Sequence, residues 1–223
     1  MKKPNMITGR AKFSRALSSL SRVTKLVQHH MAHETWDFDD VAHYHRHGNG
    51  WNGIGYNYWI SFDGKIYEGR GIAQGAHVGG HNHYTLGIGY QGHFDRQRMT
   101  DAQLRAGAEL NAWLMDKYNL STSDIIGHND LASTSCPGRN FRMSELRRMT
   151  NDILNGKDVS VRMWNPTSRS LKESAINAMK EMTDKEKYGN AAISQSWVEK
   201  AEKGELTMDD AAALGMYIAR HTK

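Results

Sequence analysis

The sequence predicts an α/β protein in which a central mixed β-sheet is flanked by helices and followed by a small all-α C-terminal domain. Segments that favour strands alternate with helical segments over the first two thirds of the chain. The last third shows helical patterns alone. The 223 residues are 39% hydrophobic and 24% charged, a globular composition, and contain no run of about 18 apolar residues that would indicate a membrane-spanning helix.

The first half of the chain contributes strands and one short helix. We expect a buried strand at 26–31 and a short helix at 38–47, which a Gly-Asn-Gly sequence ends. Aromatic and β-branched residues favour a strand at 56–62. The Asp-Gly pair at 63–64 is a strong hairpin signal, so 65–68 is predicted to be the return strand.

The next segments complete the sheet and its helices. The strand predicted at 86–90 has glycine at every second position, which suggests close backbone approach or a crowded neighbouring site. A capping box opens a helix at 100–118. A short strand at 124–128 and a closing helix at 143–154 end the first domain, residues 1–157.

Residues 158–223 are expected to form a separate helical domain. An Asn-Pro sequence at 165–166 marks a boundary, because proline disfavours helix in the residue before it. Three helical patterns follow at 171–182, 193–203 and 207–221. They hold no group of His, Cys and Asp residues, so we expect a binding or packing role there rather than a second catalytic centre.

The excess of positive charge lies at the N-terminus. The net charge is +5, and residues 1–25 form a basic arm with seven basic side chains and no acidic one. Such an arm can bind an anionic polymer or lipid, or can be a solvated surface segment. Aromatic residues other than Phe13 do not interleave with the cations, so no stable nucleic-acid partner is expected. Because the cations interrupt every apolar stretch, we expect no secretory signal peptide.

The histidines and the single cysteine are the candidate metal ligands of this sequence. One cysteine excludes an internal disulfide, and 11 of the 12 histidines lie between positions 29 and 128. His128 ends a predicted strand, and Cys136 follows in the next loop, so the two side chains can converge on one zinc ion. A third ligand would come from the pair His29 and His30. The alternative is an inert buried cysteine with surface histidines. The sequence lacks the HExxH and GxSxG motifs of other hydrolases.

Several short motifs follow one another in a fixed order between about residues 24 and 150. They are Val27-Gln28-His29-His30-Met31, Gly55-Tyr56-Asn57-Tyr58, Asp63-Gly64, Glu68-Gly69-Arg70, Gly75-Ala76-His77, Asn82, Leu86-Gly87-Ile88 and Gly127-His128 through Cys136-Pro137-Gly138. Together they resemble the zinc-dependent N-acetylmuramoyl-L-alanine amidases, a superfamily that includes phage lysozyme-type amidases and peptidoglycan recognition proteins. The resemblance implies a mixed sheet flanked by helices, with a zinc site in a groove on one side.

The resemblance also implies a ligand set. One zinc ion per chain would be held by His29, His128 and Cys136. His30 is the nearby competitor, and in a regular strand its side chain would point to the opposite face from that of His29.

Four further positions correspond to functional residues of the family. The catalytic tyrosine falls on Tyr56. Thr134 takes a position that is lysine in some members and threonine in others, so a hydroxyl replaces a positive charge there. His77 and Asn82 match positions that line the substrate groove.

The implied activity is hydrolysis of the amide that joins the lactyl carboxyl of N-acetylmuramic acid to L-alanine in bacterial peptidoglycan. The leading interpretation is a phage or prophage endolysin, made in the host cytoplasm and acting on the cell wall after release. The alternative is a non-catalytic peptidoglycan recognition module. Loss of the cysteine ligand often marks that class, and here Cys136 is present.

The C-terminal segment more loosely resembles the helical tails of Gram-positive phage lysins. This similarity implies a role in wall targeting, while a scaffold or dimerisation element is the alternative. Acidic wall polymers are a second candidate partner beside peptidoglycan.

Overall fold

The computed structural model describes residues 1–157, 169–184, 193, 195–203, 206 and 214. The chain divides into two compact units, Met1–Asp158 and Val159–Lys223. No helix in these described ranges has the length and apolar character needed to cross a membrane.

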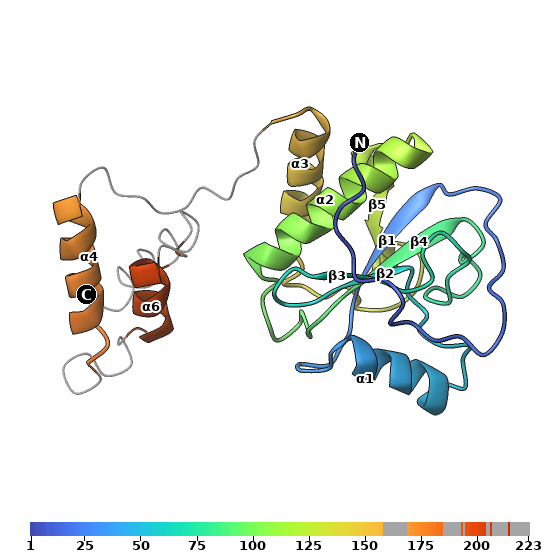
Figure 1. The fold of residues 1–223 in the computed structure, drawn as a ribbon, viewed down its shortest axis with the longest axis horizontal. Coiled ribbons are helices and arrows are strands. Elements are labelled where there is room, and N and C mark those ends of the chain that lie inside the picture. Colours follow the sequence, from blue (N-terminus) through green and yellow to red (C-terminus); the bar gives the residue numbers. More distant parts are fainter. Residues whose placement is uncertain (158–168, 185–192, 194, 204–205, 207–213, 215–223) are drawn as a thin grey trace. The chain divides into compact units, whose positions relative to one another are not determined.

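A five-stranded mixed sheet lies at the centre of the first unit (Figure 1). The strands are β1 (Lys25–His30), β2 (Tyr58–Ile60), β3 (Ile66–Glu68), β4 (Thr85–Tyr90) and β5 (Ile125–Gly127), in the order β3-β2-β4-β1-β5. β1 pairs in parallel with β4 and β5, and β2 pairs in parallel with β4. β3 is antiparallel to β2. The mixed sheet predicted from the sequence is confirmed.

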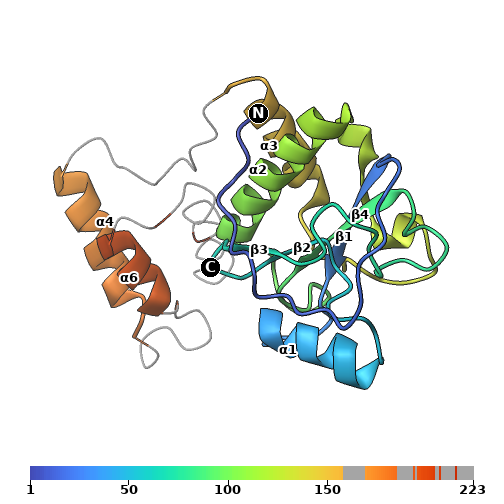
Figure 2. The ribbon, with the colours of Figure 1, turned by 45° about the vertical axis from the view of Figure 1, so that its right-hand side comes forward.

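Helices cover both faces of this sheet. Figures 1 and 2 show α2 (Asp101–Tyr118) and α3 (Met143–Leu154) on one side and α1 (Phe38–His43) on the other. The capping box predicted at the start of α2 is present between Thr100 and Gln103. The helix expected at 38–47 is α-helical in its first six residues and continues as a π-helical turn, Tyr44–Gly48.

Each face of the sheet has its own apolar core. Under α2 and α3 the core includes Leu26, Ile88, Leu104, Leu110 and Leu146. On the side of α1 a second cluster is formed by Phe38, Val41, Ile54, Tyr56 and Trp59. β1 lies between these two cores, and successive side chains of β1 therefore enter different environments.

A buried polar network ties β1 to α2. Tyr90 Oη donates a hydrogen bond to Gln28 Oε1 (2.9 Å), and Gln28 Nε2 donates to Asn111 Oδ1 (3.1 Å). Asn111 Nδ2 in turn donates to the carbonyl oxygen of Gly107 (2.7 Å). All three side chains are fully buried. The network therefore marks the face of β1 that Gln28 occupies as the α2 side.

The basic arm packs along the edge of the sheet. Ile7 forms two backbone hydrogen bonds with β3, from Ile7 N–H to Ile66 O (2.8 Å) and from Glu68 N–H to Ile7 O (2.9 Å). Three of the seven basic side chains pair with carboxylates of the same unit: Lys3 with Glu68, Arg10 with Asp39, and Lys25 with Asp124. The arm is therefore an edge-covering segment whose charge is partly neutralised.

The second unit contains α4 (Arg169–Glu181) and α6 (Gln195–Lys203). These helices correspond to the patterns predicted at 171–182 and 193–203. Their apolar cluster consists of Met179, Ile193, Val198, Ala201, Leu206 and Leu214. The boundary predicted at 165–166 lies outside the described residues, as does the third helical pattern except at position 214.

Candidate metal centre

Three predicted ligands meet at one edge of the sheet. His29 lies near the end of β1, His128 follows β5 directly, and Cys136 lies in the loop after it. β1 and β5 are parallel neighbours, so their carboxyl ends open to the same edge, where α/β proteins commonly bind ligands. One ligand atom from each residue lies within 4.8 Å of the others. His29 Nδ1 is 3.7 Å from Cys136 Sγ.

The loop that carries Cys136 is fixed by its own backbone. The Asn129 N–H donates to the Cys136 carbonyl (2.9 Å), which ties the end of β5 to the cysteine. The Cys136 N–H donates to Thr134 Oγ1 (3.2 Å). The peptide bond between Cys136 and Pro137 is cis. The two hydrogen bonds hold the thiol at a defined place beside His29.

The electrostatics of the group suit a cation. Burial lowers the pKa of His29 well below its ordinary value, and the neighbouring His77 and His128 lower it further, so the imidazole is neutral. Burial also lowers the pKa of His128, and it raises the pKa of the Cys136 thiol to about 12. A buried thiolate needs a positive charge nearby, and a metal ion supplies one. Two imidazoles and one thiolate are donors that zinc accepts, and three protein ligands are typical of catalytic zinc sites.

Tyr56 lies beside the group. Its ring centroid is 5.3 Å from that of His29, and burial raises the pKa of its phenol, which is therefore protonated at neutral pH. Gly89 pairs with His29 in the sheet, and a Cβ at Gly89 would lie 2.8 Å from the Tyr56 ring. The missing side chain makes room for Tyr56. Thr134 is exposed in the loop before Cys136.

His77 is buried beside His29 instead of exposed on a groove wall, and Asn82 is bonded to the backbone of the same segment. His77 is only 9% exposed, and its Nδ1 lies 3.0 Å from His29 Nε2. Asn82 Oδ1 accepts the backbone N–H groups of His77 (2.9 Å) and Val78 (3.0 Å). The structure therefore places His77 behind a candidate metal ligand, with Asn82 supporting the segment that carries it. The predicted contact of these two residues with substrate stays a prediction.

A second group of potential ligands lies on the other face of β1. It consists of His30, His93 and Asp95, whose ligand atoms also lie within 4.8 Å of one another. His30 Nδ1 accepts the Phe94 N–H (3.0 Å), so the neutral ring carries its proton on Nε2 and has no lone pair left for a metal. Binding a cation through His30 would break that hydrogen bond. The geometry therefore favours His29, and not His30, as the ligand.

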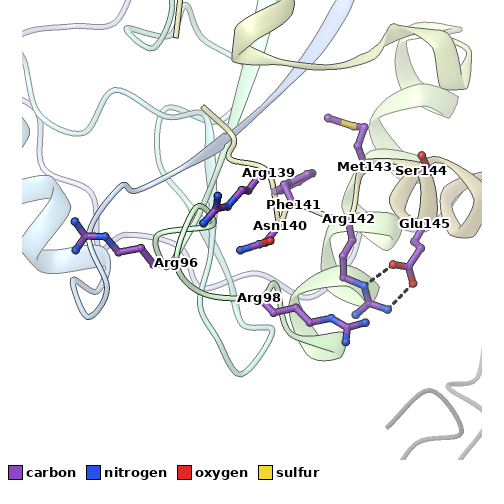
Figure 3. Close-up of a pocket in the computed structure, with 9 residues that line it drawn as sticks. All are labelled: Arg96, Arg98, Arg139, Asn140, Phe141, Arg142, Met143, Ser144 and Glu145. Carbon is purple, nitrogen blue, oxygen red and sulfur yellow. Dashed lines mark hydrogen bonds and ion pairs between the residues drawn. The ribbon is translucent and has the colours of Figure 1, made fainter. Parts of the chain in front are cut away.

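An arginine-lined cavity of about 580 Å³ lies at the start of α3 (Figure 3). Its lining residues are Arg96, Arg98, Arg139, Asn140, Phe141, Arg142, Met143, Ser144 and Glu145. Arg142 is paired with Asp101 and Glu145. Guanidinium groups recognise carboxylates and phosphates, so the cavity can bind an anionic group. The sequence did not predict it, because the lining segments lie about 40 residues apart.

A family model described as N-acetylmuramoyl-L-alanine amidase matches residues 19–139, more than half of the chain. The chain belongs to this amidase family. The matched region includes His29, His128 and Cys136, and the family fold agrees with the mixed sheet described above.

Relatives of this family member include amidases and recognition proteins. Over 114 residues the chain is 35% identical to peptidoglycan-recognition protein SC2 of Drosophila simulans, covering 50% of the chain and 61% of that protein. Over 101 residues it is 36% identical to a human N-acetylmuramoyl-L-alanine amidase, covering 44% of the chain and 18% of the human protein. The chain thus spans about three fifths or less of the length of these two relatives.

The match to a solved structure covers a larger share of both chains than the matches to these two relatives. The endolysin amidase LysCS from Clostridium intestinale is 31% identical, with a TM-score of 0.63, and the match covers 67% of this chain and 97% of that one. The amidase fold is therefore shared over nearly the whole of LysCS.

Proposed function

We propose that this family member is a zinc-dependent N-acetylmuramoyl-L-alanine amidase. It hydrolyses the amide bond between the lactyl carboxyl of N-acetylmuramic acid and L-alanine of the peptidoglycan stem peptide. The observation that carries this proposal is the convergence of His29, His128 and Cys136 within 4.8 Å. The names of the human relative and of LysCS support the same reaction.

The residues around the centre have separate tasks in this reaction. When bound, zinc polarises the scissile carbonyl and lowers the pKa of a bound water towards about 7. Tyr56 keeps its proton because burial raises its pKa, so it can donate a hydrogen bond to the oxygen on which negative charge develops. Thr134 Oγ1 already accepts the Cys136 N–H, so its own hydroxyl proton is available for a second such bond.

Mass spectrometry of purified muropeptides tests the reaction. After incubation with the protein and zinc, we expect free stem peptides that begin with L-alanine, and no such product from Cys136→Ala. Metal analysis should find one zinc per wild-type chain and almost none in Cys136→Ala. Release of no peptide by zinc-loaded wild-type protein would contradict the proposal.

A non-catalytic recognition module is the second candidate, because one relative is a peptidoglycan-recognition protein. Binding of muropeptides with no cleavage would support it. The buried thiol beside two imidazoles favours catalysis, since recognition of a sugar and a peptide does not require a metal-binding thiolate.

We also propose that the protein acts as an endolysin, a role supported by its likeness to LysCS. Expression in the cytoplasm of a susceptible bacterium should leave the cells intact until the membrane is permeabilised, and rapid lysis should follow. Lysis without permeabilisation would contradict the need for a separate release step.

The second unit is proposed to assist wall binding rather than chemistry. Both potential metal-binding groups found in the described part of the chain lie in Met1–Asp158. Residues 1–157 alone should therefore cleave soluble muropeptides while binding whole walls more weakly. A folded truncation that is inactive on soluble muropeptides would show that the two units act together.

A further inference from the structure

A line of hydrogen-bonded groups extends behind the candidate ligand His29. His29 Nε2 lies 3.0 Å from His77 Nδ1, and His77 Nε2 lies 3.4 Å from Thr85 Oγ1. Thr85 Oγ1 donates to the His81 carbonyl oxygen at 2.9 Å. His29 and Thr85 are almost completely buried, and His77 nearly so, which shields the line from competing water.

The direction of every hydrogen bond in this line follows from its last member. The His81 carbonyl can only accept, so it takes the single hydroxyl proton of Thr85. Thr85 Oγ1 must then accept from His77, which places the His77 proton on Nε2. A neutral imidazole carries a single ring proton, so with that proton on Nε2 the Nδ1 of His77 has the lone pair and faces His29 Nε2 at 3.0 Å.

The same reasoning fixes the proton of His29. Because His77 Nδ1 accepts, His29 Nε2 must be the donor and carry the proton. The lone pair of His29 is then on Nδ1, the nitrogen that lies 3.7 Å from Cys136 Sγ. The metal-facing nitrogen is therefore the one left free to coordinate.

Two glycines make the space that His77 occupies. A Cβ at Gly75 would lie 2.4 Å from His77 Cδ2, and a Cβ at Gly87 would lie 2.3 Å from His77 Cγ. Neither position accepts any larger residue without displacing the imidazole. The ring is thus held in a slot that only glycine on both sides permits.

We propose that His77 is a positioning residue, which acts through His29 by fixing the tautomer and orientation in which His29 binds the metal. The hydrogen bonds that run from the His81 carbonyl through Thr85 and His77 fix that tautomer and orientation. The inference rests on the proposed function only in taking His29 as a metal ligand. It assigns to His77 a role behind the metal in addition to any contact with substrate.

The first test needs no metal. Long-range ¹H–¹⁵N correlation spectra of the metal-free wild-type protein report which ring nitrogen of each histidine is protonated, with His29→Gln and His77→Gln spectra used to assign the two rings. We expect protonated Nε2 and bare Nδ1 in both His29 and His77. A proton on Nδ1 of His29 would overturn the proposal.

The second test measures zinc affinity by competition with a chelator. His77→Leu removes the acceptor and is expected to weaken zinc binding about 10–100-fold, as loss of a partner of a metal-bound histidine typically does. His77→Gln offers an amide oxygen to His29 and an N–H to Thr85, so it should recover most of that loss. An unchanged affinity in folded His77→Leu would overturn the proposal.

Two further variants separate positioning from packing. Gly87→Ala keeps His77 in the sequence but takes its space, and should weaken zinc binding as His77→Leu does. His45→Leu is the matched control, because His45 is also buried and hydrogen-bonded, to the Gly55 N–H at 3.1 Å. It should lower thermal stability without changing zinc affinity, and an equal loss of affinity in His45→Leu would overturn the specific role of His77.

These results also separate the inference from the proposed function. If wild-type protein binds no zinc, the proposed function fails, while the tautomer measurement still decides whether the hydrogen-bond line exists. If wild-type protein binds zinc and His77→Leu binds it equally well, the positioning role alone fails.

Discussion

The two faces of β1 carry similar side chains with different chemistry. On one face His29 meets His128 and Cys136, and on the other His30 meets His93 and Asp95. Each group brings its ligand atoms within 4.8 Å of one another. Yet His29 turns a bare nitrogen towards its group, whereas His30 uses its bare nitrogen to accept the Phe94 N–H.

The difference shows that closeness of potential ligands does not by itself make a metal site. A neutral imidazole has one lone pair, and the hydrogen bond on its other nitrogen decides where that pair points. On the His29 side the buried imidazole of His77 accepts the hydrogen bond from His29 Nε2. On the His30 side the lone pair of Nδ1 accepts a hydrogen bond from a backbone N–H. Asp95, in the same group, accepts hydrogen bonds from the Arg139 N–H (3.0 Å) and Ser135 Oγ (3.1 Å).

The largest expected effect compares His128→Ala with His93→Ala. Both histidines are half-buried, and each belongs to one of the two groups. His128→Ala should lose zinc and amidase activity, because only two ligands remain, while His93→Ala should keep one zinc and near wild-type activity. Metal analysis and muropeptide cleavage check both. Loss of zinc in His93→Ala alone would reverse the assignment of the two faces.

The next effect compares two buried tyrosines that belong to the opposite cores. Tyr56→Phe should keep zinc but lose about 10²–10³ in turnover, since one positioned hydrogen-bond donor is removed. Tyr58, whose ring packs edge-on against Trp113 of α2, is the matched control. Tyr58→Phe should cleave muropeptides at nearly the wild-type rate. Equal rates for the two variants would exclude Tyr56 from the reaction.

A smaller effect is expected from Asp95→Asn on the His30 side. This change removes the charge that accepts two hydrogen bonds from the loop around Cys136, and hydrogen bonds to a charged group stabilise more than those between neutral groups. We expect a modest fall in the free energy of unfolding in urea, with one zinc retained. A change in zinc stoichiometry with unchanged stability would indicate that Asp95 is a ligand.

The smallest effect concerns pH. Burial lowers the pKa of His30 from 6.5 to about 4, so between these values the unfolded chain binds a proton that the folded chain does not. The contribution of the neutral His30 to the free energy of unfolding is therefore complete above about pH 6.5 and is lost as the pH falls towards 4. Between pH 7 and pH 5 the free energy of unfolding of His30→Gln should therefore fall by about 1–2 kcal/mol less than that of wild type. Equal slopes in denaturant titrations would argue against a neutral buried His30.

The sequence predicted the sheet, and it predicted that the three metal-site candidates lie close together, as they do at one edge of the sheet. Because successive side chains of a strand point to opposite faces, the sequence predicted that His29 and His30 lie on different faces of one strand. It also predicted that His128 and Cys136 both follow the same strand. The glycines of β4 were correctly associated with a crowded site. These features depend on local periodicity, which a single sequence displays.

Other features depend on contacts between distant segments and could not be predicted. The burial of His77 follows from space left by Gly75 and Gly87, and its proton depends on Thr85. The basic arm was expected either to bind an anionic partner or to be a solvated surface segment. Its pairing with β3 could not be predicted, because it joins residues about 60 positions apart. The arginine-lined cavity likewise arises only when two loops meet.

The buried amide of Gln28 selects which histidine of β1 faces Cys136. Adjacent histidines invite a register error, because sliding a strand by one residue exchanges the two faces and would bring His30 towards Cys136. Such a slip would also move Gln28 away from Asn111 and Tyr90 into the apolar cluster around Trp59. Each buried polar group left unpaired costs about 1–3 kcal/mol. The choice of the proposed metal ligand is thus enforced one residue before it, by a side chain on the opposite face of β1.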